Sequence, residues 1–249
     1  MPHGFDSFAE GLRAGVETYH SLKAELKADG LLGGVGDEGG FCPNLPANEE
    51  GLKYMVRAIE GAGYSTEEMG ITLDVAATEF YHEDGYHMDG KVLSSEDLAD
   101  VYSGWLDEYP IVSIEDGFGE DDWRGWTLFT KREGHRVQTV GDDLFVTQSE
   151  RLAQGIEIGA ANAMLVKLNQ VGTVTETLEA MDMATTHGFN NVISHRSGET
   201  EDVTIADLAV GTRAGQIKTG APSRSDRVAK YNQLLRISAD VDEYRSPFN

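Results

Sequence analysis

Cysteine is nearly absent from this sequence, and long apolar runs are missing. The single cysteine, Cys42, excludes a disulfide within the chain and a metal cluster built from thiolates, and it fits a reducing compartment. No run of about 18 apolar residues occurs, so no transmembrane helix is expected. Residues 1–15 carry charges where a signal peptide needs an apolar segment. These absences predict a soluble, cytoplasmic protein.

Basic residues are also scarce. The chain has 20 Lys and Arg against 43 Asp and Glu, which gives a formal net charge of −23. Nucleic acids and anionic membranes bind basic protein faces, so neither is expected as a partner. The simplest interpretation is a solvated acidic surface. Adaptation to a salty environment is a further hypothesis, which a stability independent of salt would contradict.

What the sequence does contain is a repeated pattern in which a short β-rich run ends in a charged residue. The pattern occurs six times, and successive charged positions are 23 to 41 residues apart. Each interval accommodates one helix and a return strand, which predicts parallel strands joined by helices. The six segments are Ile71–Asp74, Ile111–Asp116, Val137–Asp143, Ala163–Asn169, Asn191–Arg196 and Gln216–Thr219.

The chain length suits a single α/β barrel, because such barrels have roughly 250 residues and this chain has 249. No linker, repeat or low-complexity segment divides it, so residues 1–249 are predicted to form one domain. The carboxyl ends of parallel barrel strands share one rim. The charged residues that end the six runs are therefore expected to lie on that rim.

Helical periodicity precedes and separates the six runs. Residues 6–29 have apolar side chains at spacings of three and four, with Ser7 and Glu10 as a possible capping box and Gly30 as the C-terminal cap. Later helices are expected from Asn48 to about Gly61 and at 94–108, 149–159, 172–188, 201–213 and 225–238.

Two segments between these elements are predicted to be irregular. Gly33–Pro46 has too many glycines and prolines for a helix, and its acidic pair, Asp37 and Glu38, makes this loop a candidate for function. Residues 81–90 are predicted to form a polar surface hairpin. Its two histidines, at positions 82 and 87, lack a third ligand and are interpreted as solvated.

Three of the predicted strand ends carry carboxylates: Asp74, Glu115 and Asp142. Carboxylates that share a cleft repel one another, so a cation is expected among them. Oxygen ligands without cysteine or a well-placed histidine favour a hard ion, and room for water and substrate favours Mg²⁺. The alternative is an acidic loop rim without a metal, which explains one such residue more easily than three in series.

The other strand ends carry cations: Lys167, His195 with Arg196, and Lys218. A lysine that ends an apolar strand is a candidate base, because nearby positive charge favours the neutral amine. The alternative is a lysine that only balances the acids. The segment SHRSGET combines a fork-shaped donor with hydroxyls and is typical of an anion pocket. Together the residues indicate proton abstraction next to a metal-bound carboxylate.

The order of the motifs resembles the enolase family over essentially the whole chain. The segments that carry the resemblance are VGDEGGFCPN, LDVAATEFY, SIEDGFGEDDW, VGDDLFVTQ, LVKLNQVGTVTET, ISHRSGETED and IKTGAPSRSDRVAKYNQLLRI. It implies a Mg²⁺-dependent lyase of glycolysis and gluconeogenesis that converts 2-phosphoglycerate reversibly to phosphoenolpyruvate, as a cytoplasmic homodimer.

The resemblance also implies roles for individual residues. Lys167 would remove the α proton and Glu38 would assist the loss of hydroxide. The metal ligands would be Asp74, Glu115 and Asp142, of which Glu115 and Asp142 also contact substrate. The remaining substrate contacts would be His195 in the pocket, Arg196 and Ser197 at the phosphate, and Lys218 on the carboxylate side.

The chain departs from the family pattern in extent. The family barrel is wound ββαα(βα)₆ and this sequence supplies αα(βα)₆, so the expected fold is an incomplete TIM-like barrel without the family's N-terminal domain and first two strands. Weak or absent turnover of the isolated chain is therefore expected. Small departures are Gly117, where the family usually has proline, and Cys42, where it usually has a small residue.

Two further interpretations remain open from the sequence. One is another dehydratase of the enolase superfamily that acts on an acid sugar, although the HRS segment suits a phosphate. The other is a non-catalytic binding protein or fragment that retains the barrel surface. A screen of substrates with and without a phosphate group would identify an acid-sugar dehydratase. A failure to bind Mg²⁺ would favour the non-catalytic interpretation.

Overall fold

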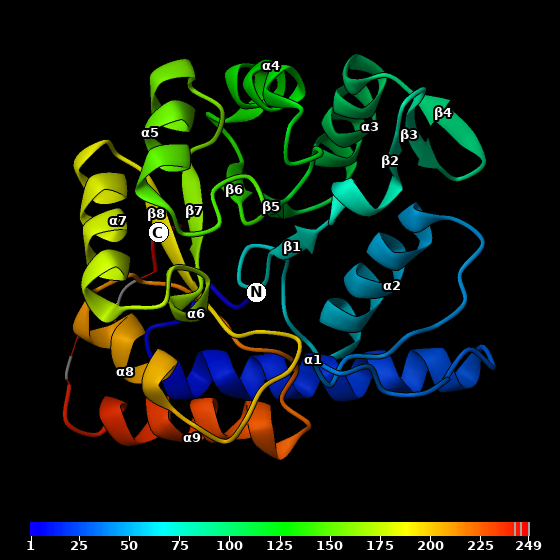
Figure 1. Ribbon diagram of the computed structural model, residues 1–249. Helices are drawn as coiled ribbons and strands as arrows, with labels where there is room; N and C mark the ends of the chain where they lie inside the picture. The colour runs from blue at the N-terminus through cyan, green and yellow to red at the C-terminus, as the bar shows by residue number, and fades with distance from the viewer. Residues whose placement is uncertain (242, 245, 249) are drawn as a thin grey trace. The chain divides into compact units, whose positions relative to one another are not determined.

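The computed structural model describes residues 1–241, 243–244 and 246–248 (Figure 1). The chain divides into two compact units. Unit 1 comprises residues 1–70 and 193–249, and unit 2 comprises residues 71–192. The prediction of one domain over 1–249 stays a prediction.

The predicted series of strands forms a parallel sheet of six strands. Its order is β1-β5-β6-β7-β8-β9, so spatial order follows chain order. The strands alternate with helices, which confirms the α/β class and agrees with an incomplete TIM-like barrel. The strands are β1 (Ile71–Asp74), β5 (Ile111–Glu115), β6 (Gln138–Gly141), β7 (Ala163–Val166), β8 (Asn190–Ser194) and β9 (Ile217–Lys218).

Unit 2 is built on strands β1, β5, β6 and β7 and on the start of β8. All four residues of β7, Ala-Met-Leu-Val, are buried, as expected for a parallel strand covered on both faces. Aromatic side chains of α3, α4 and the loop after β5 pack on one another: Tyr102, Phe118 and Phe129. The helices of this unit are α3 (Ser95–Glu108), α4 (Trp123–Glu133), α5 (Ser149–Ile158), α6 (Leu168–Val171) and α7 (Val174–Thr186), with a 3₁₀ turn, η1 (Ala77–Phe80).

The predicted surface hairpin is larger than expected. Strands β2 (Tyr81–His82), β3 (Gly85–Met88) and β4 (Lys91–Leu93) form a three-stranded antiparallel sheet. The fully buried Tyr86 anchors it, because its hydroxyl donates to Asp122 Oδ2 at 2.7 Å and accepts from the backbone N–H of Gly119 at 3.0 Å. A buried tyrosine with both hydrogen bonds made holds the hairpin to the loop that follows β5.

In the part of unit 1 that the structure describes, four helices accompany the last strand, β9. Helix α1 (Phe8–Ala28) packs against α2 (Asn48–Gly61) and α9 (Ser225–Ser238), and α9 also contacts α8 (Thr204–Gly211) (Figure 1). The segment between α1 and α2 is irregular, as predicted, apart from one bridge between Val35 and Phe41. This segment carries Asp37 and Glu38.

Helix ends are capped by side chains and by glycine. Ser94 and Asp97 form a full capping box at the start of α3. At α1 the Ser7 hydroxyl oxygen accepts from the Glu10 N–H at 3.3 Å, while the Ser7 hydroxyl itself donates to the Glu10 carboxylate at 3.1 Å. Gly30 follows α1 with a φ of 72°, a conformation that favours glycine. The short helix α6 was not predicted: it begins where the apolar run of β7 ends.

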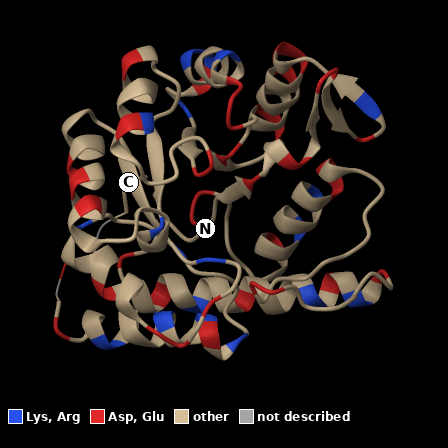
Figure 2. Ribbon diagram, viewed as in Figure 1, with Lys and Arg blue, Asp and Glu red and all other residues tan. Residues whose placement is uncertain are grey.

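The distribution of charge agrees with the composition. Acidic residues lie on helices of both units, and Lys and Arg occupy fewer positions (Figure 2). Within the described residues, no helix combines the length and the apolar character that a bilayer crossing demands.

Candidate active site

The first two predicted metal ligands lie side by side in unit 2. Asp74 ends β1 and Glu115 ends β5, and the two residues are paired in the parallel register of these strands. Asp74 is exposed, whereas Glu115 is buried. Because strand ends place both residues on one edge of the sheet, their carboxylates belong to the same rim.

The third predicted ligand, Asp142, follows the next strand, β6. Its side chain is nearly buried and forms an ion pair with Lys167, which follows β7. The side-chain amide of Gln170 donates to the other oxygen of Asp142 at 3.4 Å. The predicted base and a predicted metal ligand are therefore in direct contact.

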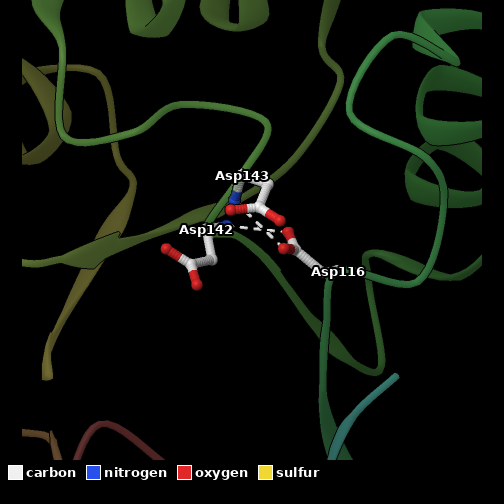
Figure 3. Close-up of side chains that lie close together, drawn as sticks. All are labelled: Asp116, Asp142 and Asp143. Carbon is white, nitrogen blue, oxygen red and sulfur yellow. Dashed lines mark hydrogen bonds between the residues drawn. The ribbon is translucent and has the colours of Figure 1, made fainter. Parts of the chain in front are cut away.

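A group of three aspartates lies close together at the same edge of unit 2. Oxygen atoms of Asp116, Asp142 and Asp143 lie within 4.8 Å of one another (Figure 3). This set shares Asp142 with the predicted ligands. The Asp116 carboxylate points at the backbone of the other two residues, and it accepts from the N–H of Asp142 at 2.8 Å and from that of Asp143 at 3.0 Å.

These hydrogen bonds give Asp116 a supporting role. Both of its oxygens are engaged by backbone donors, so the residue orients the segment that carries Asp142. Asp116 has a φ of 44°, which is left-handed and rare for a residue other than glycine, although Asp and Asn tolerate it. We therefore keep Asp74, Glu115 and Asp142 as the candidate ligands and assign Asp116 to their support.

The electrostatics of this edge favour a bound cation. Burial raises the pKa of Asp116 to about 7, although the two backbone donors act in the opposite direction. Burial and the negative charge of Asp142 raise the pKa of Asp143. A cation among these groups would offset the repulsion. The donors are carboxylate oxygens, which fit a hard divalent ion such as Mg²⁺.

The surroundings of Lys167 include a residue that sequence patterns did not reveal. Thr147 is fully buried, accepts from the Lys167 backbone N–H at 3.0 Å and donates to Gln170 Oε1 at 3.0 Å. Its φ is 56°, which is unusual for a β-branched side chain. Thr147 and Gln170 thus form a support for the Lys167 and Asp142 pair, and a lone threonine in a loop has no sequence pattern that announces this role.

The second group of predicted residues lies in unit 1. His195 follows β8 and is buried, and its Nε2 lies 3.3 Å from Oε2 of Glu38 in the glycine-rich loop. The hydrogen-bonding approach of His195, together with the positive charges of Lys218 and Arg227, lowers the pKa of Glu38 to about 2 against the effect of burial. Glu38 is therefore ionised at neutral pH in this arrangement.

The three remaining predicted residues are near His195. Two follow it in the sequence, and the third lies on the neighbouring strand. Arg196 and Ser197 follow it directly and are exposed. Lys218 ends β9, is paired with Ser194 of β8, and accepts the His195 backbone N–H through its carbonyl at 3.0 Å. Cationic and hydroxyl side chains thus gather at the ends of β8 and β9, as an anion site requires.

Arg227 of α9 is a residue of this group that the sequence did not single out. Its side chain is fully buried, and its guanidinium donates to His195 Nδ1 and to the backbone carbonyls of Asp37, Arg196 and Ser197. In the sequence it looks like a solvated arginine on a helix that also carries Arg236 in its last turn. Arg227 reaches the site only because two loops that are distant in sequence, at residues 37 and 196–197, pass over α9.

The comparison with known families agrees with the geometry. A family model described as Enolase, C-terminal TIM barrel domain, matches residues 1–246. The chain belongs to this family. Membership in the enolase family indicates a lyase of the enolase superfamily, and the aspartates at the strand ends of unit 2 provide a candidate metal site for it.

The predicted enolase residues thus form two sets. Unit 2 holds Asp74, Glu115, Asp142 and Lys167 at consecutive strand ends, and unit 1 holds Glu38, His195, Arg196, Ser197 and Lys218. The individual roles that the family resemblance implies for them stay predictions.

Proposed function

We propose that the chain is the barrel portion of a Mg²⁺-dependent enolase that converts 2-phosphoglycerate reversibly to phosphoenolpyruvate. The observation that carries the proposal is the ion pair between Lys167 and Asp142 on neighbouring strand ends, beside further carboxylates. An amine next to a carboxylate metal ligand suits the removal of a proton from the carbon beside a metal-bound carboxylate. The family match over residues 1–246 supports the same class of reaction.

In this proposal Mg²⁺ is held by Asp74, Glu115 and Asp142. When bound, it supplies positive charge that stabilises the negative charge developing on the substrate carboxylate. Lys167 takes the proton from the carbon that bears the phosphate. The released electron pair forms the carbon–carbon double bond, and the hydroxyl group leaves from the next carbon as water.

The family resemblance assigns the other parts of the substrate to further residues. Arg196 and Ser197 bind the phosphate and Lys218 lies on the carboxylate side, since cations and hydroxyls suit these anions. Glu38 supplies the proton to the leaving hydroxide. Because Glu38 has a pKa of about 2 in the chain alone, this role needs the negative charge of a bound substrate, which disfavours the ionised carboxylate.

The decisive experiment separates proton abstraction from complete dehydration. The chain is incubated with 2-phosphoglycerate in D₂O, with and without Mg²⁺. Loss of the hydrogen beside the carboxylate is followed by NMR, and phosphoenolpyruvate by its ultraviolet absorbance. We expect exchange that requires Mg²⁺, is abolished in Lys167→Met, and persists in the exposed control Lys131→Met. Glu38→Gln should retain exchange while forming less product.

The outcomes distinguish the alternative functions. Mg²⁺ binding without exchange or product would indicate a non-catalytic binding protein. Dehydration of an acid sugar without phosphate, in preference to 2-phosphoglycerate, would indicate another superfamily dehydratase. Exchange that survives in Lys167→Met would contradict the assignment of the base.

A further inference from the structure

Arg227 has an unusual set of hydrogen-bond partners. Its two Nη atoms donate to four acceptors, namely His195 Nδ1 and the carbonyl oxygens of Asp37, Arg196 and Ser197, and the last three contacts are 3.1, 2.9 and 2.8 Å long. The side chain is fully buried. Each of the four Nη hydrogens therefore has an acceptor within the protein. Because the side chain is buried, these hydrogens cannot bond to solvent water instead.

This arrangement determines which nitrogen of His195 carries the proton. A guanidinium only donates hydrogen bonds and remains charged at any ordinary pH. His195 Nδ1 must then accept, which requires an unprotonated nitrogen. In the neutral ring the proton consequently resides on Nε2.

The other ring nitrogen faces the site. His195 Nε2 lies 3.3 Å from Glu38 Oε2, and it is a buried nitrogen without a well-aligned hydrogen-bond partner among the described residues. The positive charges of Lys218 and Arg227 also reach the same carboxylate. A buried donor of this kind is costly unless an acceptor occupies the adjacent space.

We propose that Arg227 is a positioning residue that holds His195 as an Nε2–H donor directed at Glu38 and at an oxygen of the bound substrate. The statement about the substrate rests on the proposed function, whereas the state of the ring does not. His195 in this state gives a hydrogen bond and cannot take a proton at Nε2. Arg227 contacts no substrate atom in this scheme and acts through the ring and the loops.

Lys230 provides an internal comparison one turn further along α9. It is also fully buried, and its Nζ donates to the carbonyl oxygens of Thr200 and Asp226 and lies 3.6 Å from Glu199. It therefore holds the same loop as Arg227, and its Nζ contacts among the described residues go to that loop and to α9 rather than to His195. A purely structural role of α9 cations would make the two residues equivalent.

The test is a measurement of the ring nitrogens in the ¹⁵N-labelled full chain, without metal or substrate. Long-range ¹H–¹⁵N spectra at pH 8, above the ordinary titration range of histidine, report which nitrogen is protonated. The chain has seven histidines, so the His195 signals are assigned by their loss in His195→Asn. We expect an unprotonated Nδ1 and a protonated Nε2 in the wild type.

Variants then identify the cause. Arg227→Met should shift the Nδ1 signal towards the protonated form, and Lys230→Met should leave it unchanged. If Arg227→Met does not fold, Arg227→Gln serves in its place, because its shorter amide cannot reach the ring. The proposal is overturned if wild-type Nδ1 is protonated, if a folded Arg227 variant keeps the wild-type pattern, or if Lys230→Met changes it equally. Dehydration assays test the enolase reaction separately. The proposal about the His195 ring and the proposed function can therefore fail independently.

Discussion

Asp116 combines a left-handed backbone conformation with a buried carboxylate that accepts hydrogen bonds from other residues. Its φ is 44°, and its two oxygens accept the backbone N–H groups of Asp142 and Asp143. These two hydrogen bonds fix the loop after β6. The orientation of Asp142 thus depends on a residue from the neighbouring strand.

Replacement of Asp116 by Asn is expected to destabilise the chain by about 1 to 3 kcal/mol. Asn tolerates the same backbone conformation, but its NH₂ group cannot accept, so one backbone donor loses its partner. Urea denaturation of wild type and variant measures the difference. The exposed control Asp121→Asn should change stability by no more than about 0.5 kcal/mol, and an equal loss in both would argue against the loop-fixing role.

The Lys167 ammonium competes with a metal ion for Asp142, because both are cations drawn to one carboxylate. We expect Lys167→Met to tighten Mg²⁺ binding by up to about tenfold, which corresponds to about 1.4 kcal/mol. Calorimetric titration with Mg²⁺ measures the change. Asp142→Asn should weaken binding, and Lys131→Met should leave it unchanged; weaker binding in Lys167→Met would contradict the competition.

The pKa of Glu38 makes part of the stability dependent on pH. This pKa is lowered from 4.5 to about 2 in the folded chain, so the ionised carboxylate favours folding. The contribution is complete above about pH 4.5 and is lost as the pH falls towards 2. Urea midpoints of wild type and Glu38→Gln should therefore differ at pH 6 and converge as the pH is lowered. If the difference in urea midpoint grew on acidification, the pKa of Glu38 would be raised on folding and not lowered.

At the scale of elements, two glycines allow β6 and α5 to approach one aromatic ring. A Cβ on Gly155 of α5 would lie 2.4 Å from Phe145, and one on Gly141 of β6 would lie 2.7 Å from the same ring. Phe145 is fully buried. The close packing of strand and helix beside the Asp142 loop therefore depends on missing side chains.

Gly155→Ala should destabilise the chain by about 1 to 3 kcal/mol, because the overpacked ring outweighs the helix propensity of alanine. Gly104→Ala is the matched control: Gly104 lies within α3 and a Cβ there would meet nothing within 4 Å. The control should be stabilised by up to about 1 kcal/mol. Thermal unfolding of both variants checks the prediction, and two changes of the same sign would disprove the packing argument.

Helices were more predictable than strands from the sequence. Helix α9 occupies 225–238 and α2 begins at Asn48, both as expected, because periodicity and caps are local signals. Strand β9 has only two residues and β7 gives way to α6 at Lys167. Strand length depends on hydrogen bonds to neighbours that are distant in sequence, so local composition does not define it.

At the scale of the molecule, the net charge of −23 predicts a dependence on salt. Like charges repel in the compact state, and counterions screen this repulsion over about 10 Å at 0.1 M salt. We expect the melting temperature to rise between 0.05 and about 1 M KCl. Sucrose of equal osmolality is the control for a general solute effect. A melting temperature independent of KCl would contradict both this expectation and the hypothesis of salt adaptation.

The sequence by itself determined the fold class, the family and the residues at the strand ends, because each of these depends on local patterns and on motifs in a particular order. Tertiary structure decided the contacts between them: Asp116 supporting Asp142, Lys167 pairing with it, and Arg227 reaching His195 across 32 positions of the chain. A buried arginine and a solvated one look the same in a sequence. What distinguishes them is the set of acceptors that folding brings around the guanidinium, and that set comes from loops far apart in the chain.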